Sequence, residues 1–322
     1  MRRSTVLGLL VLLGVTAGSW NLAPGAGFPE KPITFIVHAS AGGGSDIFAR
    51  TLSANFERDK IFSQPIVVEN KPGGSGAIAY AYVAGKRKDP YFLLTATPSF
   101  LTTPILRKSS FGYKDFTPIA NFAFDDFFVM VKADSKYRTM KDLIEEARIS
   151  AKKVTVGGTQ LGGSDSIATY LVEKAGKVQF NFIVFNGGGE VNAALMGGHI
   201  DVAMSNPGEA LELAKANKVR LLGTLAEKRL PSAPDLPTLR EQGLDAVFQQ
   251  HRGVVAPAGI SEDARKALEG AMQRYAKSEA YRKYAEENFL SEGWMDGAAY
   301  GKYLDREAAG YPEVLQGMGL LK

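Results

Sequence analysis

The sequence predicts an α/β fold in two lobes, with mostly parallel sheets joined by two crossing segments. The chain has 322 residues, more than the roughly 250–300 at which a single core stops growing. Short runs rich in β-branched residues alternate with stretches of helical periodicity, the order typical of a sheet covered by helices. Two extended runs, 116–131 and 247–255, interrupt this order, and we expect the chain to cross between the lobes there.

The first lobe is predicted from strands that end in glycine-rich or polar turns. The run Ile33–Val37 ends at a triple glycine, and helical spacing begins near Asp46. The run at 91–96 does not alternate, which indicates burial on both faces. The predicted strands are Ile33–Val37, Ile66–Val68 and Tyr91–Ala96. One helix is expected to begin near Asp46, a second to end at Ala84 and a third to begin at Ser261.

The second lobe repeats this rhythm. Thr139 and Asp142 have the spacing of a capping box, which predicts a helix to Arg148. Further strands are predicted at Val154–Val156, Phe180–Phe185, Ile200–Met204 and Val219–Leu225, with helices at Ile167–Lys174, Val191–Met196 and Pro207–Ala216. The predicted division is a signal peptide at 1–26, domain I at 27–122 and 256–322, and domain II at 123–255 with both crossing segments.

The N-terminal segment predicts export. Arg2 and Arg3 precede an apolar run, Val6–Val15, and small residues follow, which is the layout of a signal peptide. The run is too short to span a bilayer, although a retained anchor is the alternative interpretation. We therefore expect a periplasmic protein.

Composition excludes several classes of protein and site. Lys and Arg total 38 against 34 Asp and Glu, so the net charge of +4 is too even for a dedicated nucleic-acid binder. The chain has no cysteine, which excludes disulfides, thiolate metal sites and a lipoprotein anchor. His38, His199 and His251 lack the spacing of zinc ligands, and we expect neither a metal nor a cofactor.

Three strand-to-helix turns, with one further turn, form the predicted ligand site. Helix starts carry unpaired N–H groups and partial positive charge, and glycines let a ligand approach this backbone closely. The three turns contain no Lys or Arg, so they suit a carboxylate held by amides and hydroxyls. The predicted ligand-binding residues are Ala41, Gly42, Gly43, Gly44, Ser45, Asp46, Thr97, Ser99, Gly162, Gly163, Ser164, Asp165, Asn186, Gly187 and Gly188. In the alternative interpretation, these glycines only supply tight turns, and Asp46 pairs with Arg50.

Catalytic motifs are mostly missing. The chain has no P-loop, no G-x-G-x-x-G fingerprint and no G-x-S-x-G elbow. Asp125 and Asp126 form a carboxylate pair in the first crossing segment, for which we expect a structural or hinge role. The sequence therefore favours a receptor over an enzyme; an exported hydrolase or transferase using the same cleft is the alternative.

Several blocks resemble the substrate-binding proteins of tripartite tricarboxylate transporters, the TctC or Bug family. KPITFIVHASAGGGSDIFAR at 31–50 is similar to that family's opening strand, glycine turn and first helix, and VVENKPGGSG at 67–76 is similar to a second block. FTPIA at 116–120 and RGVVAPAG at 252–259 resemble two further segments. The resemblance covers essentially the whole mature chain.

The resemblance implies a periplasmic receptor of the type II binding-protein fold that holds an organic carboxylate between its lobes. It implies that the turns at 41–46 and 162–165 bind one carboxylate, with 186–189 beside them. Membrane subunits of the transporter are the implied partners, and a membrane sensor is an alternative one. We expect a monomer that does not bind nucleic acid.

The sequence departs from the family around the expected cleft. The turn Thr97–Phe100 is unlike the family's common glycine- and asparagine-bearing loop, and Asn186 stands where a lysine is frequent. His251 replaces a usual aromatic residue. These departures put the identity of the ligand in question rather than the fold.

Overall fold

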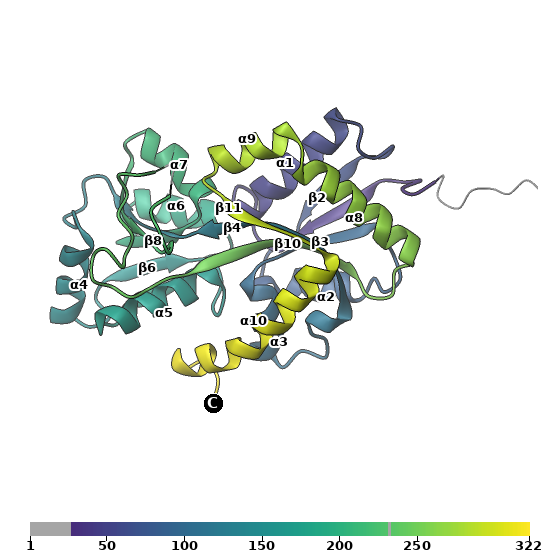
Figure 1. The fold of residues 1–322 in the computed structure, drawn as a ribbon. Coiled ribbons are helices and arrows are strands. Elements are labelled where there is room, and N and C mark those ends of the chain that lie inside the picture. The colour runs from purple at the N-terminus through teal and green to yellow at the C-terminus, as the bar shows by residue number, and fades with distance from the viewer. Residues whose placement is uncertain (1–26, 231–232) are drawn as a thin grey trace, which may run out of the picture.

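The computed structural model describes residues 27–230 and 233–322. The predicted signal peptide at 1–26 lies outside the described residues. The described chain forms two lobes, each built on a β-sheet covered by helices (Figure 1). We call the lobe around the six-stranded sheet the first lobe and the lobe around the five-stranded sheet the second lobe. This two-lobed α/β architecture confirms the predicted fold class.

The first lobe combines the N-terminal part of the chain with its C-terminal part. Its strand order is β11 (Ser291–Asp296), β4 (Phe116–Asp126), β10 (Gln249–Pro257), β3 (Phe92–Ala96), β1 (Ile33–Val37) and β2 (Ile66–Asn70). Its helices are α1 (Gly44–Arg58), α2 (Ala77–Ala84), α3 (Pro98–Arg107), α8 (Glu262–Ala276), α9 (Glu279–Glu287) and α10 (Gly297–Gly317), with short 3₁₀ turns η1 (Gly74–Gly76) and η2 (Tyr113–Asp115).

The second lobe is one continuous part of the chain. Its strand order is β7 (Asn181–Val184), β6 (Thr155–Gly158), β8 (Val202–Ser205), β5 (Phe128–Lys132) and β9 (Val219–Thr224). Its helices are α4 (Met140–Ile149), α5 (Ser164–Gly176), α6 (Gly188–Met196) and α7 (Pro207–Lys215). The predicted capping box is present, since Thr139 accepts from the amide of Asp142 while the Asp142 carboxylate accepts from that of Thr139.

Both sheets are mixed, so the prediction of mostly parallel sheets is wrong in this detail. Four strand pairs are parallel and five are antiparallel. Every antiparallel pair contains a crossing strand, β4, β5 or β10. Strand β10 runs antiparallel to β3, and β5 runs antiparallel to β8, opposite in direction to the strand–helix units beside them. Local sequence patterns do not encode this direction.

Alternating side chains bury both faces of each sheet. In β1, Ile33, Phe35 and Val37 enter one core of the first lobe, while Ile36 enters the other. In the second lobe, Val129 and Met130 of β5 likewise enter the two hydrophobic cores on opposite faces of the sheet. A strand buried on both faces lacks polar alternation, as the sequence shows.

Two segments connect the lobes. Strand β4 pairs only within the first sheet and β5 only within the second, so the chain changes sheets at Phe127. The returning chain enters β10, which pairs with β4 along nearly its whole length. The rings of Phe127 and Phe248 pack 5.5 Å apart between their centroids at this crossing.

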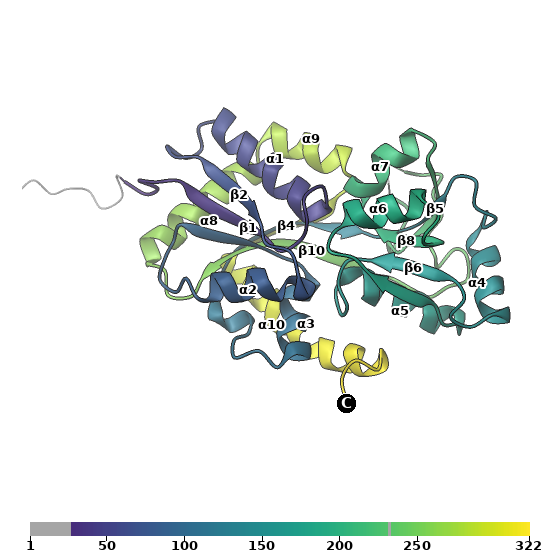
Figure 2. The ribbon, with the colours of Figure 1, turned by 180° about the vertical axis from the view of Figure 1, so that it is seen from behind.

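Helices of the first lobe also reach the second lobe. Seen from behind, α1 lies next to α6 and α7 (Figure 2). The C-terminal end of α10 extends beneath α5 (Figure 1), where Gly317 lies against the hydroxyl of Tyr170. None of the helices in the described part of the chain is long and apolar enough to cross a membrane.

Candidate functional site

Three helices begin around one small pocket between the lobes. The N-cap residues of α1, α5 and α6 are Gly43, Gly163 and Gly187, and none provides a side chain to cap its helix. First-turn N–H groups without a capping side chain, together with the helix dipole, attract an anion. We call this cavity of about 30 Å³ the inner pocket. It is lined by His38, Ala39, Gly43, Gly44, Ser45, Thr97, Thr159, Gln160, Ser164, Asp165, Gly188, Asn206 and Gln250.

Two aspartates close the turns of α1 and α5. The Asp46 carboxylate accepts from the amide of Gly42 (2.9 Å), a glycine with a φ of +82°, and from Arg50 Nε (2.9 Å). Although burial opposes the change, these contacts and Asn70 lower the pKa of Asp46. Asp165 accepts from the amide and the hydroxyl of Thr159. Both carboxylates therefore stabilise their own turns.

A chain of hydroxyl groups lines the wall formed by the first lobe. His38 Nδ1 lies 2.9 Å from Thr95 Oγ1, and His38 Nε2 lies 3.3 Å from Thr97 Oγ1. Thr97 Oγ1 in turn lies 3.1 Å from Ser99 Oγ, which contacts the Tyr80 hydroxyl at 2.5 Å. Burial lowers the pKa of His38 to about 4, partly offset by Thr95 and reinforced by the Arg252 charge. His38 is thus neutral at neutral pH and can accept or donate a hydrogen bond.

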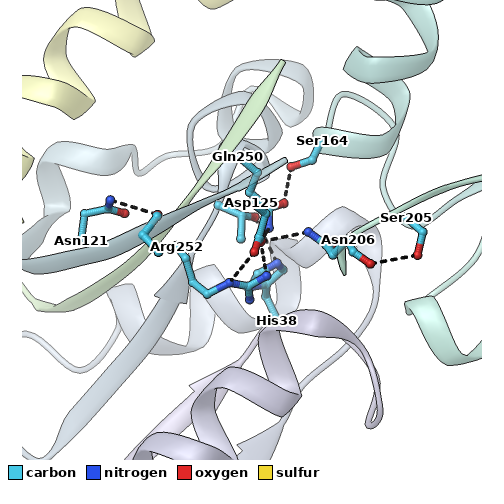
Figure 3. A network of polar contacts seen from close by, with 10 residues as sticks. His38, Asn121, Asp125, Ser164, Ser205, Asn206, Gln250 and Arg252 are labelled. Carbon is cyan, nitrogen blue, oxygen red and sulfur yellow. Dashed lines mark hydrogen bonds and ion pairs between the residues drawn. The ribbon is translucent and has the colours of Figure 1, made fainter. Parts of the chain in front are cut away.

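A buried ion pair supports the inner pocket from behind (Figure 3). Arg252 of β10 pairs with Asp125 of β4, and the two side chains are only 4% and 1% exposed. Asp125 Oδ2 also accepts from Gln250 Nε2 (2.7 Å) and Asn206 Nδ2 (2.9 Å). Ser164 Oγ donates to Gln250 Oε1 at 2.5 Å. The network joins the start of α5 to both crossing strands, consistent with the structural role expected for Asp125.

A second, larger cavity adjoins the inner pocket. We call this cavity of about 180 Å³ the outer pocket; it is lined by His38, Gly73, Gly74, Ser75, Gly76, Arg107, Thr159, Gln160, Val184, Phe185 and Asn186. The turn at 73–76 has positive φ at all four residues, including Ser75 (+57°). Glycine tolerates this conformation, and a non-glycine residue held there is a strained feature typical of functional sites.

Direct contacts close the lobes on these pockets. The Ser40 amide donates to the Asn186 carbonyl (3.2 Å), and Ser40 Oγ donates to Glu190 (3.2 Å). On the other side, Thr102 Oγ1 donates to the carbonyl of Gly162 at 2.6 Å. The small volume of the inner pocket follows from this closed arrangement.

The structure brings many, but not all, of the predicted site residues to the pockets. Those lining the inner pocket are Gly43, Gly44, Ser45, Thr97, Ser164, Asp165 and Gly188, and Asn186 lines the outer one. The others, Ala41, Gly42, Asp46, Ser99, Gly162, Gly163 and Gly187, stand behind or beside the pocket walls, in the turns that shape them.

Sequence reasoning missed a group of polar lining residues. Thr159 and Gln160 lie in the turn that was recognised, but Asn206 and Gln250 carry no motif. Arg107, a cation, lies at the end of α3, and the local sequence at Thr97–Phe100 predicts only a turn there. A proline at the first helical position, here Pro98, is the signal that could have identified α3.

Two buried histidines and one aspartate predict how stability depends on pH. Burial lowers the pKa of His251 to about 3, partly offset by the Thr97 backbone and reinforced by the Arg252 charge. Unfolded histidine protonates near 6.5, so between pH 6.5 and 3 the unfolded state binds more protons and stability falls on acidification. Burial raises the pKa of Asp165 to about 6, which opposes this fall between pH 6 and 4.

We expect urea denaturation to show the free energy of unfolding falling from pH 7 to pH 5. Each histidine can contribute up to about 1.4 kcal/mol per pH unit in its window. His251→Phe, which keeps a ring against Tyr300 and Tyr303, should flatten the dependence. His199→Gln, which removes an exposed imidazole, is the control and should keep the wild-type slope. An unchanged slope in His251→Phe would contradict the assignment.

Comparisons with known proteins identify the family. A model of the family described as "Tripartite tricarboxylate transporter family receptor", TctC, matches residues 48–320. A Cupriavidus necator protein, "UPF0065 protein in gbd 5'region", is 30% identical over 298 residues, covering 92% of this chain and 90% of that protein.

Solved structures show the same fold. The periplasmic binding protein BugD has a TM-score of 0.85 at 23% identity, covering 92% of this chain and 100% of BugD. The R. palustris protein Rpa4515, solved with adipate, has a TM-score of 0.84 at 23% identity, covering 91% and 98% of the two chains. The resemblance found in the sequence is confirmed, as is the expectation of a receptor rather than an enzyme. The chain belongs to the TctC family of tripartite tricarboxylate transporter receptors.

Proposed function

We propose that this protein is a periplasmic receptor that captures a small organic carboxylate between its lobes and delivers it to the membrane subunits of a tripartite tricarboxylate-type transporter. The observation that carries the proposal is the convergence of three glycine-capped helix starts on the inner pocket. Backbone amides from both lobes can then contact one carboxylate, so binding favours the closed arrangement.

The chemistry of the pocket supports a carboxylate. Ser45, Thr97 and Ser164 add hydroxyl groups to the amides, and glycines leave the backbone open to close approach. The Asp165 carboxylate accepts a hydrogen bond from the Thr159 hydroxyl, so it already has a partner in its own turn. Rpa4515, which shares the fold, was solved with the dicarboxylate adipate.

The periplasmic location and the transporter partner are supported by different observations. The predicted signal peptide and the fold shared with the periplasmic protein BugD support a periplasmic location. The family description supports the transporter as partner. Deleting the gene should abolish uptake of the bound acid. Normal uptake in the deletion strain, with loss of a transcriptional response to the acid, would favour a membrane sensor as partner instead.

A thermal-shift screen tests the binding proposal. The mature protein is heated with straight-chain monocarboxylates and dicarboxylates of two to eight carbons, each at millimolar concentration. A ligand that binds only the folded state raises the melting temperature, so at least one acid should do so. If no acid shifts the transition, the proposal is wrong.

Gly43→Val should block the inner pocket without disturbing the fold. Gly43 has a φ of −82° and a ψ of 164°, an extended conformation that valine adopts readily. The inner pocket, at about 30 Å³, is so small that an added isopropyl group leaves no room for a carboxylate. Calorimetry with the best acid from the screen should show affinity reduced at least about tenfold, or 1.4 kcal/mol.

Gly112→Val is the matched control, because Gly112 is also extended and has open space at its Cβ position, away from both pockets. It should bind like the wild type. Unchanged affinity in Gly43→Val, with an unchanged melting temperature, would place the carboxylate elsewhere.

A further inference from the structure

We propose that the contact between α5 and the C-terminal end of α10 is a latch that holds the two lobes closed before any ligand binds. We call it the α5–α10 contact; its central residues are Gly162, Ile167 and Tyr170 of the second lobe and Leu106, Leu315 and Gly317 of the first lobe. The inference goes beyond the proposed function, because it concerns the ligand-free protein and does not depend on which molecule is captured.

Side chains of the second lobe are buried in a core of the first lobe at this contact. Ile167 of α5 is 3% exposed and belongs to the same hydrophobic cluster as Leu304 and Tyr311 of α10. Leu171, which is four residues after Ile167 and shares its face of α5, packs against this cluster too. Separating the lobes here would expose these apolar side chains to water, which is unfavourable.

The turn that starts α5 meets the first lobe through its backbone. Gly162 has a φ of +76°, and a Cβ atom there would lie 2.5 Å from Leu106 Cδ1 and 3.4 Å from Leu315 Cδ2. Leucines of α3 and α10 therefore pack directly on the backbone of the turn. Ser164, two residues further on, lines the inner pocket. The α5–α10 contact and the candidate site therefore share one end of α5.

The last turn of α10 crosses from the first lobe to the second (Figure 1). A Cβ atom at Gly317 would stand 2.9 Å from Tyr170 Cζ and closer still to the hydroxyl. The chain then turns back in a Schellman motif, with Gly319 at a φ of +71° and the Leu320 amide donating to the Leu315 carbonyl (2.9 Å). This turn places Leu320 in the walls of two cavities that Leu161 of the second lobe also lines.

These two cavities distinguish the α5–α10 contact from a permanent core. They have volumes of about 380 Å³ and about 340 Å³. Permanent protein interiors are close-packed and contain few voids larger than a water molecule. The open packing beside the contact is therefore the packing expected of two surfaces that meet when the lobes close and separate when they open.

The lobes also meet at Ser40, where the contacts are of a different kind. There the Ser40 amide donates to the Asn186 carbonyl and the Ser40 hydroxyl donates to Glu190. Water can replace such hydrogen bonds when the lobes separate, so their net contribution is small. Water cannot replace the apolar contacts of Ile167 and Leu171 in the same way. The α5–α10 contact is thus the part of the boundary that favours closure without a ligand.

A static role is the competing explanation. In that case α5 and α10 stay together at every degree of opening, and the contact contributes only to the stability of the fold. A change at the contact would then lower the melting temperature without altering the balance between open and closed protein. The two explanations are separated by measuring that balance directly.

The test uses single-molecule fluorescence energy transfer in the ligand-free protein. The chain has no cysteine, so cysteines introduced in Ile149→Cys and Lys266→Cys are the only sites of labelling. These residues are 84% and 68% exposed, and they lie in α4 and α8 at opposite ends of the molecule (Figure 1). We expect the labelled protein without further changes to be mainly closed, in a population of high transfer efficiency.

Gly317→Leu should open the lobes. The three atoms nearest to the Cβ position of Gly317 all belong to Tyr170, so the added side chain acts on the contact between the lobes. Leucine also suits the helix better than glycine does. The ratio of open to closed protein should rise at least about tenfold. In Gly317→Leu/Tyr170→Ala, the leucine can occupy the space of the missing ring, and most of the closed population should return.

Gly310→Leu is the matched control. It makes the same substitution in the same helix, at an exposed position with open space around its Cβ atom, and it should keep the original ratio. A second pair of variants avoids the insertion of a large group. Leu320→Ser removes a half-buried side chain from both cavities and should shift the ratio toward open protein. Leu321→Ser, at a half-buried leucine that lines neither cavity, should not.

The inference is overturned if the ligand-free protein is mainly open, or if Gly317→Leu and Leu320→Ser both keep its ratio. It is also overturned if Gly310→Leu opens the lobes as much as Gly317→Leu, or if Tyr170→Ala restores nothing. Melting temperatures of all variants show whether each one is folded. Because no acid is added in these measurements, they stand apart from the thermal-shift screen. Failure of that screen would contradict the proposed function and leave the latch untouched.

Discussion

Asp125→Ala should destabilise the protein by about 3–5 kcal/mol, because it leaves the Arg252 guanidinium buried without its carboxylate. The same change removes the acceptor shared by Gln250 and Asn206. Both crossing strands and the start of α7 would lose their common anchor. Urea denaturation, followed by circular dichroism, measures the free energy of unfolding.

Two controls test the mechanism. Removing both charges in Asp125→Leu/Arg252→Met should cost less than Asp125→Ala, since the buried guanidinium is removed together with the carboxylate that it pairs with. Glu145→Ala breaks an exposed ion pair with Lys141 and should change stability only slightly. If Asp125→Ala is no more destabilising than Glu145→Ala, the ion pair does not support the crossing strands.

Gly253→Ala should destabilise the protein by about 3 kcal/mol, at the upper end of the range for overpacked cores. Gly253 lies in β10 with the ring of Tyr300 directly against it, and a Cβ atom there would stand 2.7 Å from Tyr300 Cε1 and closer still to the hydroxyl. Tyr300 is completely buried, so the ring has little room to move away. Thermal and urea denaturation of the variant measure the cost.

The hydroxyl of Tyr300 provides an internal check. It has no hydrogen-bond partner within the described residues, so Tyr300→Phe should cost little by itself. In the double variant Gly253→Ala/Tyr300→Phe, part of the clash is relieved, and the combined loss should be smaller than that of Gly253→Ala. Gly310→Ala, in the exposed face of α10 with open space at its Cβ position, should be neutral or stabilising. Equal losses in the single and double variants would contradict the clash.

The two-lobed fold could be predicted because its signals are local. Apolar runs such as Ile33–Val37 end in glycines, and helices begin at recognisable caps such as Thr139. The direction of pairing could not be predicted, since it depends on where β4 and β10 return in space. The register of β10 against β4 joins residues more than one hundred positions apart.

The candidate site was predictable only in part for the same reason. The turns before α1 and α5 can be recognised in the sequence by their glycines and serines, and both turns line the inner pocket. Asp46 and Asp165 stand in the same turns and are therefore also predicted as ligand-binding residues. In the structure, each carboxylate accepts hydrogen bonds from its own turn. Gln250 and Arg107 reach the pockets because distant elements place them there, and an isolated glutamine or arginine in a sequence carries no sign of this.

The change of sheets at Phe127 limits how the receptor can open. No loop separates β4 from β5, and the Phe127 carbonyl accepts from the Leu225 amide (2.8 Å) and the Thr224 hydroxyl (3.2 Å). Release of a captured molecule therefore requires two extended strands to flex together around the packed rings of Phe127 and Phe248. Because Phe127 alone separates the strands of the two sheets, we expect the lobes to open by a limited bend of these strands and not by free rotation about a linker.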